Sequence, residues 1–210
     1  MTKVVNKVLD ILKDRRLLHY RGPTRSVQPD AIPQALSKRQ HIIDEIVKTE
    51  RDYVQHLEML QHFQNGVQTS GAIPGDAVHD IFLNLNALLD FQRRFLIRIE
   101  QQNSLAESEQ NWGKLFSHYK DSFRVYEPFI ANQNRCSNAV ISRWKELQKA
   151  NISRELSGMV ETPAILLGFL IKPFQRLSKY PLLLTVMTAL LRQADTLLTF
   201  FLGFRKGRRL

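Results

Sequence analysis

The sequence predicts an all-α protein, an elongated bundle of long helices around one core. Apolar residues recur at spacings of three and four over several long stretches, whereas the alternating pattern typical of strands is nearly absent. The 210 residues suit one domain of ordinary size, and a hydrophobic content of 43% is enough for a sizeable core. No internal repeat or low-complexity segment interrupts the chain.

Residues 1–18 predict a short amphipathic helix. One glycine and three prolines between positions 22 and 33 then indicate a linker over residues 19–36. Ser37 is the expected N-cap of a helix that runs to about Gln64, with isoleucine, valine and leucine on one face.

The loop over residues 65–75 is marked by its glycines and a proline, and a helix is expected over residues 75–102. After a polar break, helices are expected over residues 112–132 and 136–150, and Pro163 opens a last apolar helical segment. These elements place the main domain at residues 37–196 and leave a basic tail at residues 197–210.

The chain carries a net charge of +10, from 30 basic and 20 acidic residues. Such an excess favours an anionic partner, but much of it lies near the two ends, as is typical of flexible tails. The single cysteine, Cys136, rules out a disulfide within the chain, which suits a reducing cytosol. We expect a cytoplasmic protein without a secretory signal or a membrane span.

None of the common catalytic or cofactor motifs is present. The six histidines form no H-E-x-x-H pair, and the sequence lacks a phosphate-binding glycine loop and a G-x-S-x-G elbow. Cys136 is more typical of a packing residue than of a nucleophile. We therefore expect no metal, no cofactor and no catalytic residue, and a binding protein that performs no covalent chemistry.

Two features point to a site. Lys172, Gln175, Arg176 and Lys179 lie at spacings of one helical face within an otherwise apolar stretch. The stripe is either a solvated edge, which it favours when taken alone, or a set of cations presented to a partner. Glu50 lies on or beside the apolar stripe of its own helix. It is either one half of a structural ion pair, the favoured interpretation, or a carboxylate held out for a partner.

Three segments resemble conserved regions of the Dbl-homology domain of Rho-family guanine nucleotide exchange factors: RQHIIDEIVKTERDYVQHLEML (residues 39–60), SHYKDSFRVYEPFIANQ (residues 117–133) and LIKPFQRLSKYPLLL (residues 170–184). The resemblance covers residues 37–196. The stretches DFQRRFLIRIE and VYEPFIANQNRCSNA are most similar to fungal members that act in cell polarity. In those members, residues 1–18 would be the tail of a calponin-homology domain.

The resemblance implies a bundle of about six helices, one face of which grips the switch regions of a Rho-family small GTPase and promotes GDP release. Glu50 would contact switch I, while Gln175 and Lys179 would face switch II. Glu50 and Lys179 would then be a carboxylate and a cation that are kept unpaired for the partner. It also implies recruitment to the cell cortex, with polarity scaffold proteins as further partners.

After Asp195 the sequence TLLTFFLGFRKGRRL departs from the family, which continues its fifth helix and adds a sixth. We expect a truncated domain with low stability and weak or absent exchange activity. One alternative is a non-catalytic helical scaffold that binds polarity proteins. The other is a binder of nucleic acid or anionic lipid through the basic tails. Nucleic acid is not an expected partner, and membrane association is expected only indirectly or through the tail.

Overall fold

The computed structural model describes residues 31–106, 109–150 and 152–186, with side chains from Gln40 onward. The predicted helix at residues 1–18, the linker as far as residue 30 and the basic tail at residues 197–210 lie outside the described residues. So does the stretch after Asp195 on which the expectation of a truncated, weakly stable domain depends.

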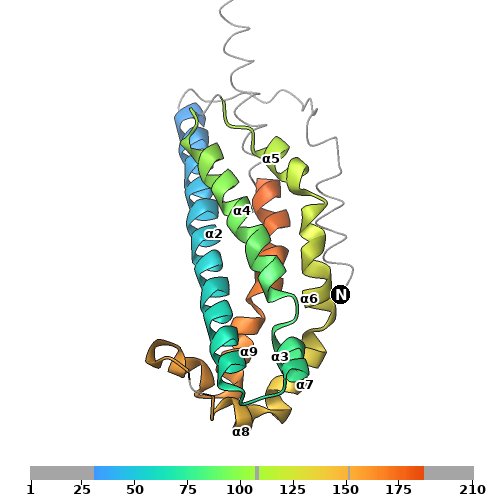
Figure 1. Cartoon of the computed structure of the whole chain (residues 1–210). Helices are drawn as coiled ribbons and strands as arrows, with labels where there is room; N and C mark the ends of the chain where they lie inside the picture. Colours follow the sequence, from blue (N-terminus) through green and yellow to red (C-terminus); the bar gives the residue numbers. More distant parts are fainter. Residues whose placement is uncertain (1–30, 107–108, 151, 187–210) are drawn as a thin grey trace, which may run out of the picture.

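The described residues form helices joined by short turns and loops and contain no strand, which confirms the all-α class. The elements are α2 (Ala31–Ser70), α3 (Gly75–Phe82), α4 (Leu85–Ser104), α5 (Trp112–Tyr119), η2 (Ser122–Val125), α6 (Tyr126–Ala131), α7 (Gln133–Ser142), α8 (Trp144–Leu147), η3 (Arg154–Val160), α9 (Pro163–Leu170) and a helix over residues 172–186. In Figure 1, α2 and α4 form one side of an elongated bundle, α5 and α6 the other, and the helix of residues 172–186 runs between them.

Helix α2 is longer at both ends than the sequence predicts. It begins at Ala31, so residues 31–36 of the predicted linker are helical. Pro33 fits there because the N–H groups of a first helical turn have no intrahelical acceptor to lose. The helix also continues through Gly66, between the buried residues Phe63 and Val67, and ends before Gly71, whose φ is 62°.

Three predicted helices are each divided by a break. The helix expected over residues 75–102 stops at Leu83, which has a φ of 54°, and restarts as α4. The side chain of Asn84 holds this break by donating a hydrogen bond of 2.8 Å to the carbonyl of Val125. The stretch 112–132 is α5, η2 and α6, and the stretch 136–150 is α7 followed by α8. Apolar spacing does not reveal such breaks, because it continues through them.

Aromatic rings fill the core between α4, α5, η2 and the helix of residues 172–186. The ring of Phe95 has five aromatic neighbours at centroid distances of 5.1 to 6.1 Å: Phe91, Phe116, Tyr119, Phe123 and Tyr180. Trp112 is also buried. The phenylalanines and tyrosines of this cluster therefore belong to the core.

Among the described residues, no single helix is long and apolar enough to cross a membrane. The helices Arg154–Val160 and Pro163–Val186 reach the necessary length and composition only when taken together, and they are bent by 102° at their junction.

Cys136 on α7 has no exposed surface, and burial raises the pKa of its thiol to about 12. We predict that Ellman's reagent at pH 8 modifies Cys136 at least about a thousandfold more slowly in the native protein than in urea, because the thiolate is the reactive form. Since the chain has one cysteine, the absorbance change reports this site alone.

The matched control is a Cys136→Ala protein that carries Ser142→Cys, at an exposed position of the same helix. It should react rapidly in the native state. Equal rates for Cys136 in native and denatured protein would contradict the buried position.

Candidate functional site

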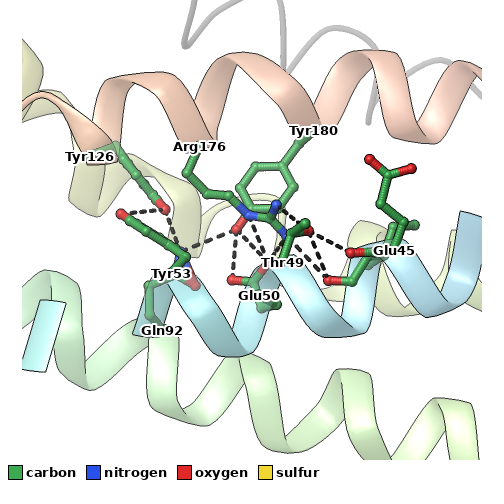
Figure 2. Close-up of polar contacts among 9 residues, drawn as sticks. Glu45, Thr49, Glu50, Tyr53, Gln92, Tyr126, Arg176 and Tyr180 are labelled. Carbon is green, nitrogen blue, oxygen red and sulfur yellow. Dashed lines mark hydrogen bonds and ion pairs between the residues drawn. The ribbon is translucent and has the colours of Figure 1, made fainter. Parts of the chain in front are cut away.

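The site lies where the helix of residues 172–186 runs alongside the middle of α2 (Figure 2). The apolar stripe of α2 is interrupted by Glu50, whose side chain therefore points into the core and has no exposed surface. Arg176 faces it from the other helix and is 5% exposed. The two unusual features of the sequence, Glu50 and the cationic stripe that contains Arg176, are thus in contact.

The guanidinium of Arg176 donates hydrogen bonds to one turn of α2. Its Nε lies 3.0 Å from Oε2 of Glu50, and its Nη2 donates to the same oxygen. Its Nη1 donates to the hydroxyl of Thr49 over 2.8 Å, and Nη2 also reaches the carbonyl of Ile46 at 3.5 Å. The cation is therefore hydrogen-bonded to three acceptor groups within one turn of the same helix.

Tyr180, one turn after Arg176, completes the coordination of the carboxylate. Its hydroxyl lies 2.9 and 3.0 Å from the two oxygens of Glu50. The guanidinium carbon of Arg176 lies 4.9 Å from the centroid of the Tyr180 ring, which adds a cation–π contact. Both residues that bond the carboxylate of Glu50 therefore come from the helix of residues 172–186.

A chain of hydrogen bonds continues from Tyr180 through the core (Figure 2). Gln92 of α4 donates from Nε2 to the hydroxyls of Tyr180, at 3.2 Å, and of Tyr126. The hydroxyl of Tyr126 in turn donates to that of Tyr53 over 3.2 Å. The network therefore ties together α2, α4, α6 and the helix of residues 172–186.

Burial dominates the electrostatics of the site. It raises the pKa of Glu50, while the charge of Arg176 and the hydrogen bonds from Arg176 and Tyr180 oppose that rise. Burial alone would lower the pKa of Arg176, but Tyr180 and Glu50 outweigh it and raise that pKa. Burial also raises the pKa values of Tyr53, Tyr126 and Tyr180, so these hydroxyls stay neutral at physiological pH.

The structure divides the predicted cationic stripe. Gln175 and Lys179 are exposed and Lys172 is half-buried, whereas Arg176 points into the core. The prediction that all four residues share one face of the helix is therefore wrong for Arg176. Among the described residues, the side chain of Lys179 has no ion-pair partner. The same is true of Lys172, so an unpaired charge does not by itself single out Lys179.

The expectation that Glu50 is kept unpaired is wrong in this structure. Its carboxylate is bonded to Arg176 and Tyr180, as the alternative of a structural ion pair predicted. Binding of a GTPase by Glu50, Gln175 and Lys179 stays a prediction.

Sequence reasoning missed the remaining members of the network. Gln92 offered a signal of the same kind as Glu50, because it is a polar residue among the buried apolar positions of α4. Tyr53 and Tyr126 offered none, since a tyrosine on an apolar stripe is ordinary core material. No group of three or more histidine, cysteine, aspartate or glutamate side chains within the described residues could hold a metal ion.

We predict that Glu50→Met or Arg176→Met alone lowers the free energy of unfolding by about 3–5 kcal/mol, because each leaves a buried charge without its partner. The double variant should cost far less than the sum of the two, since it removes both charges. Urea unfolding followed by far-ultraviolet circular dichroism measures all three.

The ion pair between Arg94 and Asp90 is the matched control, because both side chains are 66% exposed. Asp90→Ala and Arg94→Met should each change stability by less than about 1 kcal/mol. Additive losses at Glu50 and Arg176 would show that the two side chains are not coupled.

Comparison with known proteins supports the same family as the sequence resemblance. The family model described as the RhoGEF domain matches residues 42–195. Cell division control protein 24 of Saccharomyces cerevisiae is 37% identical over 161 residues, which are 75% of this chain and 18% of that protein. Rho guanine nucleotide exchange factor scd1 of Schizosaccharomyces pombe is 35% identical over 159 residues, 76% of this chain and 18% of that protein.

A solved structure of the Vav1 exchange factor superposes with a TM-score of 0.63 at 24% identity, covering 77% of this chain and 47% of that one. This likeness concerns the fold alone. The chain spans about a fifth of the length of the two fungal relatives. The resemblance to the Dbl-homology domain and to fungal members of its family is thereby confirmed, and the chain belongs to the RhoGEF family.

Proposed function

We propose that this chain is a guanine nucleotide exchange domain that promotes GDP release from a Rho-family small GTPase by remodelling its switch regions. Membership of the RhoGEF family supports the activity. The observation that carries the proposal is the exposed, unpaired Lys179 on a helix that is held rigidly against α2.

The described charges suit an acidic partner surface. The helix of residues 172–186 contains two lysines and one arginine and no acidic residue. Arg176 is neutralised by Glu50, which leaves Lys172 and Lys179 as the cations at this surface. An ammonium group and the neighbouring amide of Gln175 can bind carboxylates and carbonyls of a switch segment.

Exchange of this kind is a shift between binding states and involves no bond cleavage. A protein that binds the nucleotide-free GTPase more tightly than the GDP-bound form must, by linkage, weaken the binding of GDP. No cofactor is needed on the exchange domain for this activity. The expected location, the cytoplasm with recruitment to the cell cortex, stays a prediction.

Glu50 is the least accessible of the three predicted contacts. A direct contact between its carboxylate and switch I would first require the hydrogen bonds from Arg176 and Tyr180 to break. Such a step would leave Arg176 as a buried cation without a partner. Gln175 and Lys179 are therefore the residues that we propose to touch the GTPase directly.

We predict that the protein accelerates release of a fluorescent GDP analogue from one member of a panel of Rho-family GTPases. Lys179→Ala should reduce this acceleration by about tenfold or more, because a charge-assisted contact contributes roughly 1.5–3 kcal/mol. It should leave the thermal unfolding midpoint unchanged, since Lys179 is exposed. Lys145→Ala on α8, at one end of the bundle in Figure 1, is the control and should retain full activity.

Acceleration that survives Lys179→Ala would contradict the assignment of the contact. Binding of a GTPase without acceleration would instead favour the second candidate, a non-catalytic scaffold. A folded protein that neither binds nor accelerates any GTPase of the panel would overturn the proposed function.

A further inference from the structure

The two residues with a positive φ in the described part of the chain bracket α3. Gly71 precedes the helix with a φ of 62°, and Leu83 ends it with a φ of 54° and a ψ of −130°. Glycine adopts a positive φ freely, whereas leucine does so rarely because its Cβ collides with the backbone. The chain is therefore strained at one end of α3 and relaxed at the other.

Anchors on both sides of Leu83 hold the strained angle in place. Phe82 has no exposed surface, and its ring centroid lies 5.8 Å from that of Phe63 on α2. On the other side, Asn84 donates a hydrogen bond of 2.8 Å to the carbonyl of Val125. A strained residue persists only where its surroundings over-determine its conformation. Release of α3 would allow Leu83 to relax, so the strain lowers the free energy that this release requires.

Helix α3 lies beside α7 at one end of the bundle (Figure 1). It has eight residues, four of which form its buried apolar face: Ala77, Val78, Ile81 and Phe82. An ion pair of 2.7 Å joins Asp80 to Arg135 of α7, whose side chain is 63% exposed, and such a pair adds little stability. A helix this short is not stable by itself, so α3 loses its backbone hydrogen bonds whenever it leaves α7.

The inner face of α7 is held from more than one side. Gln133, Cys136 and Val140 lie on that face at helical spacing, and all three are buried. Arg135 bonds α3, while the amide of Gln133 donates to the carbonyl of Leu170 at the end of α9 over 3.4 Å. Helix α7 therefore keeps its contact with α9 when α3 leaves.

We propose that α3 is a hinged flap that opens as a unit about Gly71 and Leu83, while α4, α7 and α9 stay folded. Relief of the strain at Leu83 favours the open form, and burial of the apolar face of α3 favours the closed form. The open form exposes the inner face of α7, including Cys136, to solvent. No GTPase takes part in this opening, so it is independent of the proposed exchange activity.

Hydrogen exchange followed by mass spectrometry tests the flap in the unmodified protein. After correction for intrinsic rates, the amides of residues 78–82 should exchange at least about tenfold faster than those of residues 91–99 in α4. Low concentrations of urea should change the exchange of α3 little, because a local opening exposes little surface. Equal protection of both segments with one steep urea dependence would overturn the proposal, since α3 would then open only with the whole domain.

Leu83→Gly and Leu83→Ala form a matched pair, because both remove the side chain and only glycine relieves the strained φ. The amides of α3 should exchange about fivefold or more slowly in the Leu83→Gly protein than in the Leu83→Ala protein. Equal exchange in the two proteins would overturn the hinge at Leu83. If either variant does not fold, the comparison of α3 with α4 in the unmodified protein still decides.

The ion pair that joins α3 to α7 gives a second test. Asp80→Asn should speed the exchange of the α3 amides by about twofold to fivefold. Asp90→Asn is the matched control, since Asp90 is an exposed acid that is paired within α4, and it should leave α3 unchanged.

Cys136 reports the same opening through its slow reaction with Ellman's reagent in the native protein. Asp80→Asn should speed this reaction by the same factor as it speeds the amide exchange of α3, and Asp90→Asn should not change it. A thiol that reacts only at the rate set by global unfolding would overturn the flap, because the inner face of α7 would then never be uncovered by α3 alone.

Discussion

The structure depends on the neutralisation of one buried charge by another. A carboxylate in the core of a helical bundle is intolerable unless it is paired and hydrogen-bonded. Glu50 finds its partner in Arg176, 126 residues further along the chain. This requirement brings α2 and the helix of residues 172–186 together in one register, because no displaced register would place the guanidinium within reach of Glu50, Thr49 and the carbonyl of Ile46.

Around this pair the core is both apolar and polar. The rings that surround Phe95 supply burial, while the hydroxyls of Tyr53, Tyr126 and Tyr180 and the amide of Gln92 carry hydrogen bonds between four helices. Apolar packing alone tolerates small shifts of one helix along another. The polar network does not, because a shift would break hydrogen bonds between buried groups, and the network therefore favours one arrangement.

The same short segment builds the core and presents the candidate site. In the RhoGEF family to which this chain belongs, the stretch KPFQRLSKYP is central to the resemblance. Its inward residues hold the helix, and its outward residues, one position earlier in each case, face solvent. Stability and recognition are thus physically coupled in this segment. Only substitutions at exposed positions such as Lys179 can therefore test a binding contact without also changing the stability of the fold.

The sequence by itself determined the helical class, the approximate helices and the family, because apolar period and motif are local properties of the chain. It also singled out Glu50 as a polar residue on an apolar stripe. Tertiary structure decided the break at Leu83, where a contact between Asn84 and Val125 ends one helix. It also decided which cation turns inward, because Arg176 and Lys179 share a helix and only the position of Glu50 on a neighbouring helix distinguishes them.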